Sequence, residues 1–271
     1  MISRWPRCGR MAARFTWSMD LTRSINARWP GRSSASWRNN NQDTQTLMED
    51  PFLIRCKDAT ELFIVRHGDA LPDADEIIPG GVYDDLPLSR LGREQAQTLA
   101  ERLGSVHFAA IYSSPLRRCQ ETAAPLAQRL ELTPILVPAL KEIKLGNIRP
   151  LPDHGEDLSI LTEALKERQI DIVRIAGETG HWDTIPDSEP SKEFRRRVVD
   201  AFDEIASKHR GERVIAFAHG GVVNAYAAET LGLERDFFFP AGNTSITVIK
   251  VLDKQRVLYV LNDIAHIKRH V

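Results

Sequence analysis

Cysteine is scarce in this chain, and its three copies follow no pairing pattern. Cys8, Cys56 and Cys119 are spread along 271 residues without a CxxC pair. This spacing excludes a disulfide framework and indicates a reducing compartment. Long apolar segments are missing too: no run approaches the roughly 20 residues of a membrane-spanning helix, and none resembles the apolar region of a secretory signal. We therefore expect a cytoplasmic protein with no membrane partner.

Acidic residues are nearly absent from the start of the chain. Residues 1–42 contain eight arginines, no lysine and a single acid, Asp20, which gives a net charge of +7. Because the whole chain has a net charge of −1, the remaining residues carry −8. An acidic body argues against a general nucleic-acid surface. We therefore expect no nucleic-acid partner.

Residues 1–47 differ in composition from everything that follows. They hold four of the five tryptophans and many arginines and serines, and no helical or strand period persists in them. Such a segment is typical of an organelle transit peptide, of a disordered arm, or of translated sequence upstream of a natural start at Met48. These alternatives stay open. In each case the sequence predicts a domain boundary there, with a single domain over residues 48–271.

From residue 61 onward, apolar strands alternate with amphipathic helices. The patterns predict strands at 61–66, 109–112, 133–137, 213–218, 245–252 and 257–261, and helices at 90–103, 157–169, 192–208 and 221–231. A further helix is expected after residue 114, with Ser114 as its N-cap, Pro115 at its first position and a kink or break at Pro125. The alternation predicts an α/β fold with a mostly parallel sheet.

Two of these strands stop abruptly at a histidine followed by glycine. Leu62–Val65 ends in Arg66-His67-Gly68, and Val214–Ala218 ends in His219-Gly220-Gly221. Open α/β sheets bind ligands at the carboxyl ends of their strands. An arginine offers a planar set of donors for a phosphate, and a histidine can attack phosphorus and carry the phosphoryl group. We therefore expect both histidines to face one anionic substrate.

Two further segments can contribute to such a site. Ser113-Ser114-Pro115-Leu116-Arg117-Arg118 joins a strand to a helix, whose free N–H groups and positive dipole favour an anion. Adjacent helical residues point about 100° apart, so only one of the two arginines is expected to face the anion. Glu142 follows the strand expected at 133–137, and a carboxyl group held near a phosphate can act as general acid.

His-Gly-Gly also occurs in the oxyanion hole of α/β-hydrolase esterases. Those enzymes need a G-x-S-x-G nucleophile elbow, which this sequence lacks. The esterase hypothesis is therefore excluded. The acidic residues between positions 69 and 85 are expected to form a solvated loop and no metal site.

Taken together, the motifs resemble those of the histidine phosphatase superfamily, which contains the cofactor-dependent phosphoglycerate mutases. The resemblance extends from about Glu61 to Thr247. It rests on ordered pieces, namely Arg66-His67-Gly68, Leu86-Pro87-Leu88-Ser89-x-x-Gly92-x-x-Gln95-Ala96, Ile111-Tyr112-Ser113-Ser114-Pro115-Leu116-x-Arg118 with Thr122-Ala123, Leu140-x-Glu142-Ile143, His219-Gly220-Gly221 and Gly242-Asn243-Thr244-Ser245.

The resemblance implies a three-layer α/β/α fold of the phosphoglycerate mutase type, with an insert at about 143–190 over the active site. It implies that His67 is the nucleophile that becomes phosphorylated and that Arg66, Arg118 and His219 bind the phosphoryl group. Glu142 matches the general acid, with Asp69 as a second candidate. No metal and no other cofactor is implied. The expected partner is a small phosphorylated substrate, and the oligomeric state stays open.

Two departures bear on the activity. Mutases of the family have a Ser or Thr and an Asn after the Arg-His-Gly motif, whereas this chain continues with Asp69-Ala70-Leu71-Pro72. Pro186-Asp187-Ser188-Glu189-Pro190 stands where Gly-Glu-Ser is often found. We therefore expect a metal-independent phosphatase that hydrolyses phosphomonoesters through phosphohistidine at His67. The alternatives are a mutase-type phosphotransferase and a non-catalytic module that binds phosphorylated ligands.

Overall fold

The structure is a computed structural model that describes residues 50–71, 85–146 and 158–267. These residues belong to one compact unit, Met48–Val271. The expectations for residues 1–47 lie outside the described residues. Among the helices that are described, none combines the length and the apolar character needed to cross a membrane.

A mixed sheet forms the centre of the described unit. Its six strands are arranged in the order β3-β2-β4-β1-β5-β6. The strands are β1 (Thr60–Arg66), β2 (Ala110–Ser113), β3 (Ile135–Leu136), β4 (Arg213–Ala218), β5 (Ile246–Leu252) and β6 (Gln255–Asp263). Strands β1 to β4 run parallel to one another, and β5 and β6 add an antiparallel edge. Because β1 and β4 are parallel neighbours, the motifs that follow them meet at one edge of the sheet.

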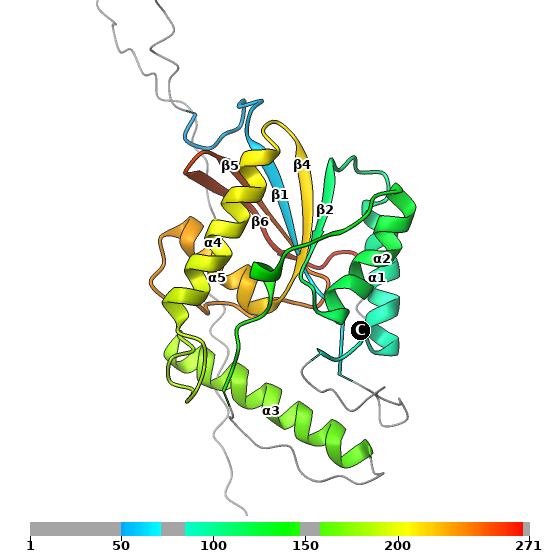
Figure 1. Cartoon of the computed structure of the whole chain (residues 1–271), viewed down its shortest axis with the longest axis vertical. Coiled ribbons are helices and arrows are strands. Elements are labelled where there is room, and N and C mark those ends of the chain that lie inside the picture. Colours follow the sequence, from blue (N-terminus) through cyan, green and yellow to red (C-terminus); the bar gives the residue numbers. More distant parts are fainter. Residues whose placement is uncertain (1–49, 72–84, 147–157, 268–271) are drawn as a thin grey trace, which may run out of the picture. The chain divides into compact units, whose positions relative to one another are not determined.

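Helices cover both faces of this sheet (Figure 1). Helices α4 (Ser191–Lys208) and α5 (Gly220–Leu231) pack on one face, and α1 (Arg90–Leu103) and α2 (Arg117–Leu130) pack on the other. A short 3₁₀ helix, η4 (Pro138–Leu140), and the long α3 (Leu158–Thr179) lie between α2 and α4 in sequence. The three-layer α/β/α fold that the sequence predicted is confirmed.

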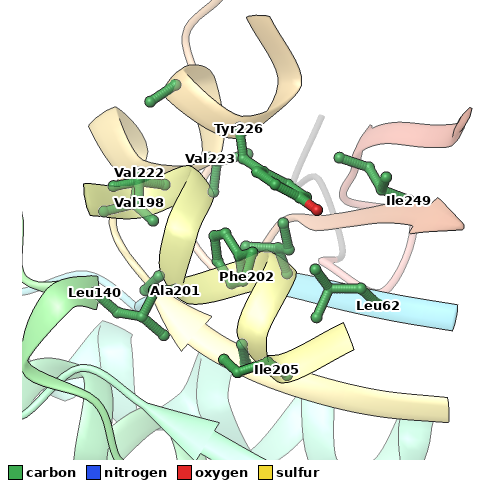
Figure 2. Packing of buried hydrophobic residues seen from close by; sticks show 14 of the residues in the cluster. Leu62, Leu140, Val198, Ala201, Phe202, Ile205, Val222, Val223, Tyr226 and Ile249 are labelled. Carbon is green, nitrogen blue, oxygen red and sulfur yellow. The ribbon is translucent and has the colours of Figure 1, made fainter. Parts of the chain in front are cut away.

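Side-chain alternation along the strands produces two separate cores. Leu62 and Ile64 of β1 face α4 and α5, where Phe202 and Tyr226 are fully buried with ring centroids 4.7 Å apart (Figure 2). Val65 faces the opposite core beneath α1 and α2. Burying one such large apolar side chain contributes about 1.5–3 kcal/mol, so the strands that position the histidines are firmly held.

Two elements between residues 133 and 179 differ from the prediction. The third strand is only two residues long and lies at the edge of the sheet, where Ile135 and Leu136 are half-exposed. The helix expected at 157–169 continues to Thr179. Its first half packs Leu161 and Leu165 against Leu86, and its second half buries Ala176 in the main core. The sequence pattern did not show that one helix would pack in two different cores and therefore continue past residue 169.

The start of α2 was also predicted wrongly. The helix begins at Arg117 with Leu116 as N-cap and no side-chain cap, so Ser114 and Pro115 precede it. The Arg117 N–H is instead bound by Asp85 Oδ1 at 2.7 Å, a partner distant in sequence. Pro125 does not divide the helix, which continues to Leu130 while Leu126 packs in the core beside α1.

Candidate active site

The two histidines predicted to share a site lie at the ends of adjacent parallel strands. Arg66 of β1 is in register with Ala218 of β4, and the His67 N–H donates to the Ala218 carbonyl at 2.9 Å. Both imidazoles are buried, and their ring centroids are 5.2 Å apart. The topology of the sheet thus brings together two motifs that are 152 positions apart in the sequence.

His67 is held in one orientation by its own loop. Its Nδ1 lies 2.7 Å from the Gly68 carbonyl oxygen, which can only accept, so Nδ1 carries the proton. The lone pair is therefore on Nε2, where Arg118 Nε donates at 3.2 Å. Burial lowers the pKa of His67 well below its usual value, and the charges of Arg118 and Arg66 lower it further. The ring is thus neutral at neutral pH and carries a lone pair on Nε2.

Arg66 and Arg118 supply positive charge beside this nitrogen. Arg66 donates through Nη1 to the Ala241 carbonyl, while its buried Nε has no hydrogen-bond partner among the described residues. A buried donor without a partner is costly, and an anion would satisfy it. Arg117, by contrast, is exposed and pairs with Glu121 at 3.3 Å. The structure thus places one arginine of the pair, Arg118, at His67.

The residues after His67 are fixed by side chains from both α1 and α2. The Gly68 N–H donates to Thr122 Oγ1 at 3.0 Å, and the Asp69 N–H donates to Gln95 Oε1 at 2.8 Å. Ser89 donates to the Asp69 carboxylate and also caps α1 by accepting from the Gly92 N–H. These contacts explain why the motif residues around positions 89–95 and 122 accompany the Arg-His-Gly segment. They hold the loop that follows His67.

Gly92 is required by close backbone packing at this point. A Cβ atom on Gly92 would lie 2.0 Å from the Asp69 carbonyl oxygen, which no backbone shift of a few tenths of an ångström could relieve. The N-terminal turn of α1 therefore packs directly on the loop after His67.

Glu142 reaches the same end of the sheet from the loop after η4. Its Oε2 accepts from the Gly221 N–H at 3.1 Å, and its Oε1 accepts from the Ile143 N–H at 3.0 Å. The carboxylate thus lies at the N-terminus of α5, two residues after His219. A Cβ on Gly221 would come within 2.3 Å of Glu142 Oε1, so the second glycine of His-Gly-Gly makes room for the acid.

Arg197 and Glu189 hold the loop that carries Glu142. Arg197 donates to the carbonyls of Ala139 at 2.7 Å and Glu142 at 3.2 Å, and its Nε bonds Glu189 Oε1 at 2.6 Å. Glu189 belongs to the segment that departs from the usual Gly-Glu-Ser. Sequence reasoning missed both residues, because no local pattern connects position 189, position 197 and the loop.

His219 has two close neighbours that the sequence did not assign to the site. Its Nε2 lies 2.9 Å from Ser114 Oγ and 3.4 Å from Cys119 Sγ. Burial lowers the pKa of His219 well below its usual value, with further lowering from Arg118, His67, Arg66 and Arg197. Within the part of the chain that the structure describes, no group of three or more His, Cys, Asp or Glu side chains could hold a metal ion.

Comparisons with known proteins agree with this geometry. The model of the histidine phosphatase superfamily (branch 1) matches residues 62–264. A metal-independent phosphoserine phosphatase from Arabidopsis thaliana is 32% identical over 215 residues, covering 78% of this chain and 84% of the relative. Phosphoglycerate mutase-like protein 4 of the same plant is 29% identical over 214 residues, covering 78% and 88%. A solved mycobacterial glucosyl-3-phosphoglycerate phosphatase matches with a TM-score of 0.58 and 26% identity, covering 75% of this chain and 99% of that one.

Proposed function

The chain belongs to the histidine phosphatase superfamily (branch 1) and is a hydrolase that acts on phosphomonoesters, and we propose that His67 carries the phosphoryl group during that reaction. The observation that carries this assignment is the state of the His67 ring. Nδ1 is fixed as a donor by the Gly68 carbonyl, so Nε2 presents a lone pair beside the guanidinium of Arg118. A nucleophile next to a fixed cation is the arrangement that phosphoryl transfer needs.

In the first half of the reaction, His67 Nε2 forms a bond to phosphorus while the bond from phosphorus to the ester oxygen breaks. Arg66, Arg118 and His219 bind the three non-bridging oxygens and stabilise the charge that develops on them. Glu142, which enters this half of the reaction protonated, gives its proton to the departing oxygen, which leaves as an alcohol. The products of this half are the alcohol and the phosphohistidine.

In the second half, water replaces the phosphoryl group on His67. Glu142, now a carboxylate, accepts a proton from water as the water oxygen attacks phosphorus. The bond from phosphorus to Nε2 breaks, inorganic phosphate leaves, and both His67 and Glu142 return to their starting states.

Glu142 is preferred to Asp69 as the acid because of what each carboxyl group contacts. The Asp69 carboxylate accepts from the Ser89 hydroxyl, and the Asp69 carbonyl accepts from the Ser89 N–H at 2.9 Å. These contacts fix the loop after His67, which suits a structural role. Glu142 lies at the N-terminus of α5, two residues after His219, where its Oε2 accepts from the Gly221 N–H at 3.1 Å. Glu142→Gln should therefore reduce turnover of poor leaving groups far more than that of p-nitrophenyl phosphate.

Hydrolysis of p-nitrophenyl phosphate in the presence of a chelator tests the metal-free covalent mechanism. We expect activity in wild type, an acid-labile phosphate trapped on His67, and loss of both in His67→Ala. His107→Ala is the matched control, because His107 is exposed on the surface. Activity retained in His67→Ala would contradict the assignment of the nucleophile.

A mutase-type phosphotransferase remains the alternative, favoured by the mutase-like relative. The chain has Asp69-Ala70-Leu71 after the motif, where mutases resemble one another in Ser or Thr and Asn. Conversion of 3- to 2-phosphoglycerate in the presence of a bisphosphoglycerate distinguishes the two reactions. A binding module without catalysis would give no burst of product and no trapped phosphate.

The wider setting is part of the same proposal. The partner is a small phosphorylated substrate, and a substrate panel should begin with phosphoserine and phosphorylated glycerates, which the names of the relatives suggest. Residues 48–271 act as one domain with an insert at about 143–190 over the active site. Leu161 and Leu165 of α3 support this by packing against Ala70 and Leu71, just after the motif. The free, buried Cys119 suits a cytoplasmic location, and we propose no nucleic-acid or membrane partner.

A further inference from the structure

We propose that Ser114 is a positioning residue that allows His219 to take up a proton when the phosphoryl group binds. This inference rests on the proposed function and adds a residue to it. The sequence suggested that Ser114 begins a helix, but α2 begins at Arg117 and has no side-chain cap. Its hydroxyl oxygen accepts from the Leu116 N–H at 3.4 Å, and a shorter contact of 2.9 Å joins it to His219 Nε2.

The sheet fixes Ser114 and His219 side by side. Strands β2 and β4 are parallel, with Ser113 in register with Phe217, and the Ser114 N–H donates to the Phe217 carbonyl at 2.9 Å. Ser114 immediately follows β2, and His219 immediately follows β4. Both are fully buried, so neither side chain can obtain a replacement partner from solvent.

A hydroxyl suits this position because it can serve His219 in both protonation states. When the ring is neutral, the hydroxyl can donate to Nε2 if the ring proton is on Nδ1, or accept from Nε2–H if the proton is on Nε2. Toward a protonated ring it accepts from Nε2–H. The second donor of the ring, the N–H at Nδ1, lies 3.8 Å from Cys119 Sγ and is the one that we assign to a phosphoryl oxygen. A buried apolar residue at position 114 would leave the protonated ring with an unpaired donor, which is costly in a buried site.

The other groups around His219 make this partner important. Arg118, Arg66 and Arg197 are cations that oppose its protonation, and an incoming phosphoryl group favours it. The charged and titratable groups around the ring are Arg118 and Cys119 of α2, Arg66 at the end of β1, His67 after β1, Arg197 of α4, and Glu142 near Gly221. Cys119 donates its S–H to the Ala218 carbonyl at 3.3 Å, so its sulfur is a weak acceptor and Ser114 is the strong one.

Binding of inorganic phosphate as a function of pH tests this role. The variants are Ser114→Ala, which removes the hydroxyl, and Ser114→Thr, which keeps it. Ser113→Ala is the matched control: Ser113 is equally buried, and its hydroxyl donates to the Ser114 carbonyl at 2.8 Å. The readout is the inhibition constant of phosphate against p-nitrophenyl phosphate hydrolysis.

Phosphate should bind less tightly above the pH at which the His219 ring loses its second proton. We expect this pH to be lower by about one unit in Ser114→Ala, because the protonated ring loses its acceptor. Ser114→Thr should restore the wild-type limit, and Ser113→Ala should not move it. Equal profiles in Ser114→Ala and Ser113→Ala, with phosphohistidine still formed on His67, would overturn this inference and leave the proposed function standing.

Nitrogen NMR of the wild-type protein gives a test that needs no variant to fold. On addition of phosphate at neutral pH, the His219 ring should change from one protonated nitrogen to two. A His219 ring that stays neutral when phosphate is bound would overturn the inference. The proposed function is tested separately, by the loss of phosphoenzyme in His67→Ala.

Discussion

Two arginines of this chain, Arg118 and Arg197, lie near the same end of the sheet and are used in opposite ways. Arg197 is saturated by protein groups: it bonds the Glu189 carboxylate and three backbone carbonyls of the loop at 139–142. Arg118 presents its Nε to the lone pair of a neutral histidine. A guanidinium that is paired with a carboxylate and with carbonyls fixes structure, whereas one aimed at a nucleophile stabilises charge that arrives during a reaction.

The contrast predicts different costs for removing each side chain. Loss of Arg197 leaves Glu189 and several carbonyls without their partner, so stability should suffer. Loss of Arg118 removes the donor to His67 Nε2, so transition-state stabilisation should suffer. The following substitutions test that difference, from the largest expected effect to the smallest.

Arg118→Ala should cause the largest loss of activity. Removal of one preorganised donor to a charged transition state costs about 10²–10³-fold in turnover. We expect kcat for p-nitrophenyl phosphate to fall by that amount while the melting temperature changes little. The control is the adjacent Arg117→Ala, which removes an exposed arginine whose side chain pairs with Glu121 at 3.3 Å. Equal activity losses in the two variants would show that charge in general, and not contact with His67, is responsible.

Gly221→Ala should reduce activity by displacing Glu142. The added methyl group would lie 2.3 Å from Glu142 Oε1, so the carboxylate must leave the N-terminus of α5. Misplacement of a catalytic group by about 1 Å can cost about 10²-fold. Gly220→Ala is the matched control, because its Cβ would meet Arg66 Nε at an ordinary 3.6 Å. A Gly221→Ala enzyme as active as the Gly220→Ala enzyme would argue against Glu142 as the general acid.

Much of this fold and site could be predicted from the sequence, because local patterns carry the information. The strand ending at Arg66, the helix capped by Ser89 and the pair of histidine-glycine motifs are each visible within about ten residues. What could not be predicted depends on contacts between distant segments. Asp85 caps α2 in place of Ser114. Arg197 reaches the Glu142 loop across more than fifty residues, and no periodicity records such a contact.

Arg197→Met should cost stability more than catalysis. The variant keeps the length of the side chain but leaves Glu189 without its partner, and breaking an interaction of this partly buried kind costs about 1–3 kcal/mol. We expect a clear fall in the urea midpoint of unfolding and a loss of activity well below that of Arg118→Ala. The exposed Arg196→Met should leave both properties unchanged. An activity loss as large as that of Arg118→Ala, at unchanged stability, would contradict the contrast drawn above.

The smallest expected effect concerns pH, and it follows from the cations around His67. Burial, Arg118 and Arg66 hold the pKa of His67 well below its ordinary value of 6.5, so the ring stays neutral and nucleophilic below pH 6.5. The acid limit of kcat/KM should therefore lie below pH 6.5. Because the folded pKa is depressed, the unfolded chain binds the extra proton first, so this histidine lowers stability as pH falls below 6.5 and has no such effect above it.

Arg118→Lys retains a cation but shortens its reach, so it should raise the acid limit only slightly, whereas Arg118→Met should raise it further. An acid limit that does not move in Arg118→Met would show that burial alone keeps His67 neutral, and that the arginine acts on the phosphoryl group without tuning the nucleophile.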